Sequence, residues 1–203
     1  MSHVIEGIKH DISNFGTMDL MVAVVFGVVV RVVFIVGSPI INVFFHGLGP
    51  IGDLVNALTL LWVVYSMMLI PGALRRNGLV PLVATEVMSL LRVVTGDPYG
   101  FIAVQAYLAA GIGALITLNY FKHSLGYVQW FINSFVWTFF VDLVFGLYFS
   151  VYPFLGDMLL GWLWYLIVCR IANAIPMMFV IPIVTKSLLG MEALRPVVVK
   201  PPS

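Results

Sequence analysis

The acidic, amide and aromatic side chains that could do chemistry in this 203-residue chain lie within or beside long apolar stretches. Glu86 and Asp142 are carboxylates inside such stretches, and Tyr99 lies in the turn "TGDPYG" between two of them. A carboxylate there can form a charge-assisted hydrogen bond to a cationic ring or an amidine-like edge, and an aromatic ring can stack on a flat heterocycle. These residue types predict a ligand-binding site. The candidate ligand contacts are Glu86, Tyr99, Gln105 and Asp142, followed by Asn56, Arg92 and Trp162.

The sequence lacks the residue patterns of a nucleophilic or metal centre. It contains no His-Glu-x-x-His, no Gly-x-Ser-x-Gly, no Walker phosphate-binding loop and no pair of cysteines. None of the four histidines lies within an apolar stretch or has the helical spacing of a metal pair. We therefore expect no catalytic residue, no metal and no cofactor. Any ATP hydrolysis would have to come from a partner subunit.

The composition is that of an integral membrane protein, because 62% of the residues are hydrophobic and only 9% are charged. Soluble domains have about 25% charged residues. A net charge of +1 without a basic patch also excludes a nucleic-acid partner. About 20 apolar residues are needed to cross the hydrocarbon core as a helix. We predict an all-α integral membrane protein, a six-helix transmembrane bundle, with spans at about 19–37, 51–70, 79–94, 101–120, 127–151 and 158–187. Pro176 and Pro182 predict a kink or an early end in the last span.

Arg31, Arg92 and Arg170 fall within the predicted spans, and the other lysine and arginine residues all lie on one side of them, which predicts the orientation. The opposite loops, "SPIINVFFHGLGP", "TGDPYG" and "YPFLGD", contain none. Both termini are therefore predicted to be cytoplasmic in a multi-pass protein of the cell membrane. The expected parts are a cytoplasmic amphipathic segment 1–18, a transmembrane domain 19–187 and a cytoplasmic tail 188–203. The cations on the predicted inner side are Lys9, Arg75, Arg76, Lys122, Lys186, Arg195 and Lys200.

Much of the polarity within the spans lies in their predicted outer half. This pattern predicts a cavity that opens outward above an apolar floor, because charges at that depth normally face the interior of a bundle. The same charges could instead form internal ion pairs that fix the helix register. In the first span, Ala23 and Gly27 are spaced four apart, a spacing that lets another helix approach closely. That helix could belong to the same bundle or to a partner protein.

Two segments carry a resemblance to a known family. They are "GLGPIGDLVNALTLLWVVYSMMLIPGALRRNG" and "LVATEVMSLLRVVTGDPYGFIAVQAYLAAGIGALI". Together with the expected six spans, they resemble the S components of energy-coupling factor (ECF) vitamin transporters, most closely the YkoE-type family assigned to thiamine or its hydroxymethylpyrimidine precursor.

The resemblance implies a substrate-capturing subunit that is not itself an enzyme. Its partners would be a transmembrane scaffold subunit and two ATPase subunits, besides membrane lipid and the vitamin. The Ala-x-x-x-Ala docking pattern of the family corresponds to Ala23 and Gly27 here, with glycine in place of the second alanine. The family is thought to tumble in the membrane to carry its ligand inward.

Three alternatives remain open from the sequence. The first is an S component for another micronutrient, such as biotin or riboflavin. The second is a membrane-embedded enzyme acting on lipid or prenyl substrates, for which Glu86 and Asp142 would be a sparse set of acids. The third is a structural or assembly subunit, which predicts fully paired charges and no cavity.

Overall fold

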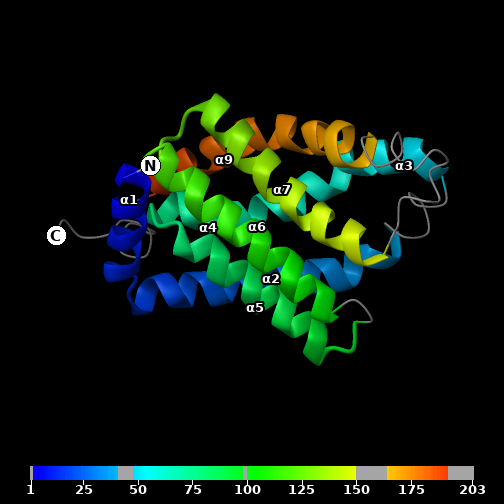
Figure 1. Ribbon diagram of the computed structural model, residues 1–203, viewed down its shortest axis with the longest axis horizontal. Helices are drawn as coiled ribbons and strands as arrows, with labels where there is room; N and C mark the ends of the chain where they lie inside the picture. Colours follow the sequence, from blue (N-terminus) through cyan, green and yellow to red (C-terminus); the bar gives the residue numbers. More distant parts are fainter. Residues whose placement is uncertain (1, 41–47, 98–99, 150–163, 192–203) are drawn as a thin grey trace.

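The computed structural model describes residues 2–40, 48–97, 100–149 and 164–191, and all of the regular structure in these ranges is helical (Figure 1). Two short π-helical segments, Ala57–Leu61 and Trp164–Cys169, directly precede helices α4 and α9. The all-α class is thus confirmed. The α-helices are α1 (Ser2–Ser13), α2 (Thr17–Ile40), α3 (Gly49–Asn56), α4 (Trp62–Arg75), α5 (Leu79–Val94), α6 (Gly100–Tyr120), α7 (Tyr127–Phe149) and α9 (Arg170–Leu189).

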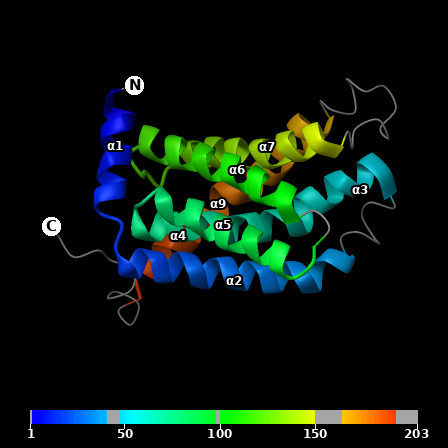
Figure 2. The ribbon, with the colours of Figure 1, turned by 60° about the horizontal axis from the view of Figure 1, so that its bottom comes forward.

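The long helices run side by side, and α1 lies across one end of them (Figures 1 and 2). Within the bundle α5 packs against α2 and α6, α7 packs against α6 and α9, and α4 packs against α2 and α9. The α4–α5 turn and the α6–α7 turn lie at the same end as α1, which we call the α1 end. Helix α3 and the α5–α6 turn lie at the other end, which we call the α3 end.

Four helices are long and apolar enough to cross a membrane. They are Thr17–Gly37, Gly100–Tyr120, Tyr127–Leu147 and Leu166–Leu189. The predicted spans 51–70 and 79–94 are also helical. The first is interrupted by the π-helical segment, and α5 has only 16 residues. A membrane protein with several spanning helices is therefore supported, while the number six stays a prediction.

The two π-helical segments meet in a cluster of small side chains. Ala57 from the first segment packs with Cys169 from the second and with Ala172 of α9, and all three are buried. π-Helical turns inside longer helices are frequent at functional sites because they re-aim the flanking side chains. In the last predicted span the irregular part is the π-helical segment Trp164–Cys169, which lies before α9. The predicted early end at Pro176 or Pro182 does not occur, because α9 continues through both prolines to Leu189.

The small residues of α2 face the inside of the bundle. Ala23 is 0% exposed, and a Cβ atom on Gly27 would lie only 2.6 Å from the carbonyl oxygen of Ala84 on α5. Helix α5 therefore packs against Gly27 within the bundle, and docking of a partner on Ala23 and Gly27 stays a prediction. The exposed face of α2 is lined by valines such as Val25, Val32 and Val36.

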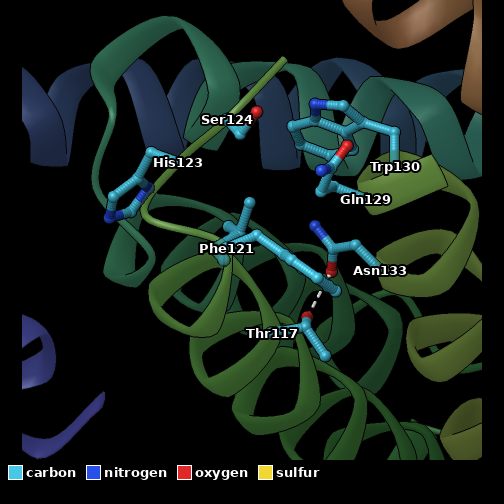
Figure 3. Close-up of a pocket in the computed structure, with 8 residues that line it drawn as sticks. Thr117, Phe121, His123, Ser124, Gln129, Trp130 and Asn133 are labelled. Atoms are coloured by element: carbon cyan, nitrogen blue, oxygen red, sulfur yellow. Dashed lines mark hydrogen bonds between the residues drawn. The ribbon is translucent and has the colours of Figure 1, made fainter. Parts of the chain in front are cut away.

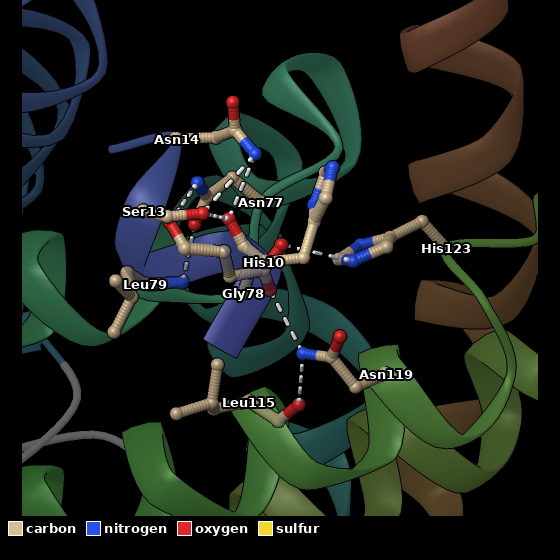
Figure 4. A network of polar contacts seen from close by, with 10 residues as sticks. His10, Ser13, Asn14, Asn77, Gly78, Leu79, Leu115, Asn119 and His123 are labelled. Atoms are coloured by element: carbon tan, nitrogen blue, oxygen red, sulfur yellow. Dashed lines mark hydrogen bonds and ion pairs between the residues drawn. The ribbon is translucent and has the colours of Figure 1, made fainter. Parts of the chain in front are cut away.

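A polar network closes the α1 end (Figure 4). Asp11 of α1 is 1% exposed, and its Oδ2 accepts hydrogen bonds of 2.8 Å from the Gly78 amide and from Asn119 Nδ2. Its Oδ1 lies 3.5 Å from His123 Nε2. Burial alone would raise the pKa of Asp11, but the hydrogen bonds from His123, Asn119 and Gly78 outweigh burial and hold its pKa below the usual 3.8. The network fastens α1 to the α4–α5 and α6–α7 turns.

Candidate functional site

Three buried aromatic side chains from three helices form the centre of the candidate site. Tyr65 of α4, Tyr107 of α6 and Trp137 of α7 are 5%, 2% and 0% exposed. The ring centroids of Tyr65 and Trp137 are 5.0 Å apart, and those of Tyr107 and Trp137 are 5.7 Å apart. Such tilted and edge contacts are the favoured geometries for aromatic pairs. We call Tyr65, Tyr107 and Trp137 the aromatic trio.

The indole nitrogen of Trp137 is buried and has no hydrogen-bond partner among the described residues. An indole N–H can only donate, and buried polar groups nearly always have a partner in native proteins. Leaving one without a partner costs about 1–3 kcal/mol. The aromatic trio therefore combines packed aromatic rings with a buried donor that a ligand could use.

An ionic cluster at the α3 end joins α2, α5 and the α5–α6 turn. Arg92 Nε and one terminal nitrogen donate to the two carboxylate oxygens of Asp97, at 2.9 and 3.2 Å. Arg31 of α2 also reaches Asp97, at 3.5 Å, and donates to the Thr95 hydroxyl. The Arg92 guanidinium lies 5.9 Å from the centroid of the Phe145 ring. Asp97 thus balances two guanidinium groups at once.

A second carboxylate–guanidinium pair links α7 to α9. Asp142 Oδ2 lies 2.6 Å from Arg170 Nε, and the two side chains are only 8% and 1% exposed. Tyr107 lies within the electrostatic reach of both Arg92 and Asp142. The aromatic trio therefore adjoins both ionic groups, and we call the whole arrangement the aromatic–ionic site.

Two buried amides lie close to the π-helical segments. Asn56 is 2% exposed and Asn173 is 0% exposed. The Oδ1 of Asn56 and both polar atoms of Asn173 have no hydrogen-bond partner among the described residues. Asn56 precedes Ala57 and Asn173 follows Ala172, and these two alanines belong to the same packed cluster. Buried polar groups without a described partner therefore lie beside the π-helical segments.

The structure brings some of the predicted contacts together and separates others. Arg92 and Asp142 belong to the aromatic–ionic site, where both form ion pairs within the chain. Gln105 lies on the exposed face of α6, between Phe101 and Leu108.

Glu86 of α5 is half-buried, and Leu90, one turn later on the same helix, is 54% exposed. Ser89 donates to its backbone oxygen at 2.9 Å, and its Oε1 has no hydrogen-bond partner among the described residues. Tyr99 and Trp162 lie outside the described residues.

Sequence reasoning missed the aromatic trio, Asp97 and Asn173 as site residues. It recognised Arg31 and Arg170 as charges within spans without assigning them to the site. The sequence did contain a signal for Asp97, which lies five positions after Arg92. With this spacing, a side chain in the turn after a helix can reach a side chain in the last turn of that helix, as the ion pair shows. The sequence did not indicate that Tyr65, Tyr107 and Trp137 point into the bundle, because helices that are apolar on all sides show no hydrophobic periodicity.

No protein-family model matches the chain, and no curated protein or solved structure is similar enough to count as a match. Within the described ranges, no three His, Cys, Asp or Glu side chains are placed so that they could hold a metal ion. The function is therefore inferred from the geometry of the aromatic–ionic site and its place in the bundle.

Proposed function

We propose that this chain is a membrane-embedded subunit that captures a small, flat, polar nutrient from outside the cell, as the S component of an ECF-type importer. The observation that carries the proposal is the aromatic–ionic site, in which the aromatic trio adjoins two carboxylate–guanidinium groups toward one end of an apolar bundle. Mainly apolar surroundings with a few fixed polar groups are typical of small-molecule binding. Thiamine or hydroxymethylpyrimidine is the favoured ligand.

The distribution of exposed charge supports an outward orientation of this site. Lys9, Arg76, Lys122 and Lys186 are exposed at the α1 end. Among the described residues of the α3 end, Arg31 and Arg92 are partly buried and both contact Asp97. By the positive-inside rule the α1 end faces the cytoplasm. In this proposal six spans, formed by α2, α3 with α4, α5, α6, α7 and α9, place both termini inside.

The charges of the site favour a neutral ligand over a cationic one. Arg31, Arg92 and Arg170 contribute three guanidinium groups, against the two carboxylates of Asp97 and Asp142. A thiazolium ring would have to compete with a guanidinium for a carboxylate that is already paired. A neutral aminopyrimidine can stack on the aromatic trio and accept a hydrogen bond from Trp137 Nε1 through a ring nitrogen. We therefore place hydroxymethylpyrimidine ahead of thiamine.

Import would require partner subunits, because the sequence contains no nucleotide-binding motif. The proposed partners are a transmembrane scaffold and two ATPases. Since α5 packs against Gly27 and Ala23 is buried, a scaffold that docks on α2 would use the exposed valine face.

A structural subunit without a ligand is the second candidate. It is favoured by the pairing of Asp97 and Asp142 with arginines inside the chain. Binding measurements on the purified chain with hydroxymethylpyrimidine, thiamine, biotin and riboflavin separate the two candidates. Saturable binding of one of them at micromolar concentration supports the capture function. If all four fail to bind at millimolar concentration, the structural candidate is preferred.

A further inference from the structure

A second pocket lies at the α1 end, at the opposite end from the aromatic–ionic site. It is a shallow, narrow depression, formed where the end of α6, the α6–α7 turn and the first turns of α7 meet (Figure 3). Its lining includes Thr117, His123, Ser124, Gln129, Trp130 and Asn133. The proposed capture function makes no use of this pocket.

The lining of this pocket contains buried donors that lack a partner. Asn133 is 1% exposed, and its Oδ1 accepts a 2.7 Å hydrogen bond from the Thr117 hydroxyl. Figure 3 shows the Asn133 amide nitrogen turned away from Thr117, toward the side where Gln129 and Trp130 lie. That nitrogen has no partner among the described residues, and neither has the indole nitrogen of Trp130, which is also 1% exposed. Buried donors without an acceptor in the lining of a pocket indicate a site for a group with acceptor oxygens.

The start of α7 adds positive potential at the same place. Helix α7 begins at Tyr127 and has 23 residues, so the amides of its first three residues have no helical carbonyl to bond, and its dipole is positive at this end. Lys122 is exposed in the adjoining turn. Helix N-termini with such amides commonly bind phosphate or other anions.

The backbone of the α6–α7 turn is held in an unusual conformation next to the pocket. Lys122 and His123 have positive φ angles of 51° and 54°, although neither is glycine. Strained backbone of this kind tends to occur at functional sites. Asp11 contacts His123 through Nε2, and the other ring nitrogen, Nδ1, is buried without a hydrogen-bond partner among the described residues.

We propose that this pocket binds a phosphate group, either as the free ion or in the headgroup of a phospholipid in the adjacent leaflet. Asn133 Nδ2, Trp130 Nε1 and the first-turn amides of α7 donate to the phosphate oxygens, and Lys122 supplies charge. The half-buried side chain of Gln129 and the exposed side chain of Ser124 swing aside to admit the group. Exposed Tyr120 and Tyr127 on either side of the turn suit the membrane interface.

The test uses the full-length chain in mild detergent with two probes. Inorganic phosphate is added in a thermal-shift measurement with chloride as its control. Phosphatidylglycerol retention is followed by native mass spectrometry against a neutral galactolipid of equal chain length. Protection by phosphate identifies the free ion as a ligand, and selective retention of phosphatidylglycerol without phosphate protection identifies the lipid headgroup.

Charge variants at the half-buried Gln129 keep this test independent of folding. Gln129→Glu should weaken binding of the probe that responds by at least about fivefold, and Gln129→Lys should strengthen that binding, because the substituted side chain lies beside the bound anion. Asn133→Leu should abolish the response. If neither probe responds in the wild-type chain, or if the two Gln129 variants respond alike, the phosphate site is overturned. Vitamin binding at the aromatic–ionic site is unaffected by either result.

Discussion

Asp142 on α7 and Arg170 on α9 form an ion pair with 2.6 Å between Oδ2 and Nε, and both side chains are buried. The pair lies beside the aromatic trio and follows directly after a π-helical segment, since Arg170 is the first residue of α9. It therefore has two roles in the proposal. It holds two helices in register, and it supplies polar groups at the edge of the ligand site.

Breaking this pair on one side should destabilise the chain strongly. Arg170→Met leaves the Asp142 carboxylate buried without its guanidinium, and we expect a loss of about 3–5 kcal/mol in the free energy of unfolding. The double variant Asp142→Leu with Arg170→Met should lose less than Arg170→Met alone, because no buried charge remains. Unfolding by a denaturing detergent, followed by circular dichroism, measures both. Lys186→Met, an exposed cation on the same helix, is the matched control. If the double variant loses as much free energy of unfolding as Asp142→Leu and Arg170→Met lose when added together, the ion-pair assignment is contradicted.

Removing the Trp137 N–H donor should lower ligand affinity without lowering the stability of the chain. Trp137→Phe deletes an indole N–H that has no partner among the described residues, so the unliganded chain should keep or slightly gain stability. Ligand affinity should fall about fivefold, because the bound heterocycle loses one hydrogen bond worth about 1 kcal/mol. Calorimetric titration gives the affinity, and thermal unfolding gives the stability.

The matched control for Trp137→Phe is Trp130→Phe at the other end of α7. It also removes a buried indole N–H without a described partner, but it lies in the second pocket. We expect it to leave vitamin affinity unchanged. Equal losses of affinity in the two variants would place the ligand elsewhere than the aromatic trio.

Enlarging Gly27 should destabilise the bundle itself. Any Cβ atom at this position comes within 2.6 Å of the Ala84 carbonyl oxygen and 2.9 Å of the Val87 side chain. Gly27→Val should therefore cost about 1–3 kcal/mol of unfolding free energy through overpacking. Val25→Leu, on the exposed face of α2, should change stability little. Should Gly27→Val unfold like the wild type while losing a partner in pull-down measurements, the row would face outward after all.

Acid should loosen α1 through Asp11. The folded-state pKa of Asp11 lies below its usual value of 3.8, so its stabilising contribution is complete above that value and is lost as the pH falls through the folded-state pKa. The melting temperature of the wild-type chain should thus exceed that of Asp11→Asn at pH 6, and the gap should narrow below about pH 4. A gap that stays constant down to pH 3 would show that the Asp11 network does not titrate as described.

Hydropathy predicted the helices well, because apolar length is the dominant signal in such a chain. The positions of α2, α6 and α7 follow the predicted spans closely. The sequence did not predict the π-helical segments, which contribute Ala57 and Cys169 to one buried cluster although these residues are far apart in the chain. The sequence also suggested a kink at the prolines of α9, whereas the irregular turn precedes that helix.

The directions in which individual side chains point were harder to predict than the helices. Asp11 belongs to a segment expected to lie on the membrane surface, yet tertiary hydrogen bonds bury it while Ile5 and Ile12 remain exposed. Gln105 and Glu86 were both expected to point into the bundle. Gln105 instead lies on the face of α6 that neither α5 nor α7 covers. Arg92 and Asp142 were placed correctly as interior charges, because a charge in an apolar helix has few other acceptable positions.

The central claim is that the aromatic–ionic site holds a flat nutrient, and one calorimetric titration tests it most directly. Hydroxymethylpyrimidine is titrated into the purified wild-type chain and into Tyr107→Leu, which removes one ring of the aromatic trio. The proposal predicts saturable micromolar binding to the wild type and a loss of about fivefold or more in the variant, because stacking on the ring is lost. No heat of binding in the wild type, or the same affinity in both chains, would contradict the claim.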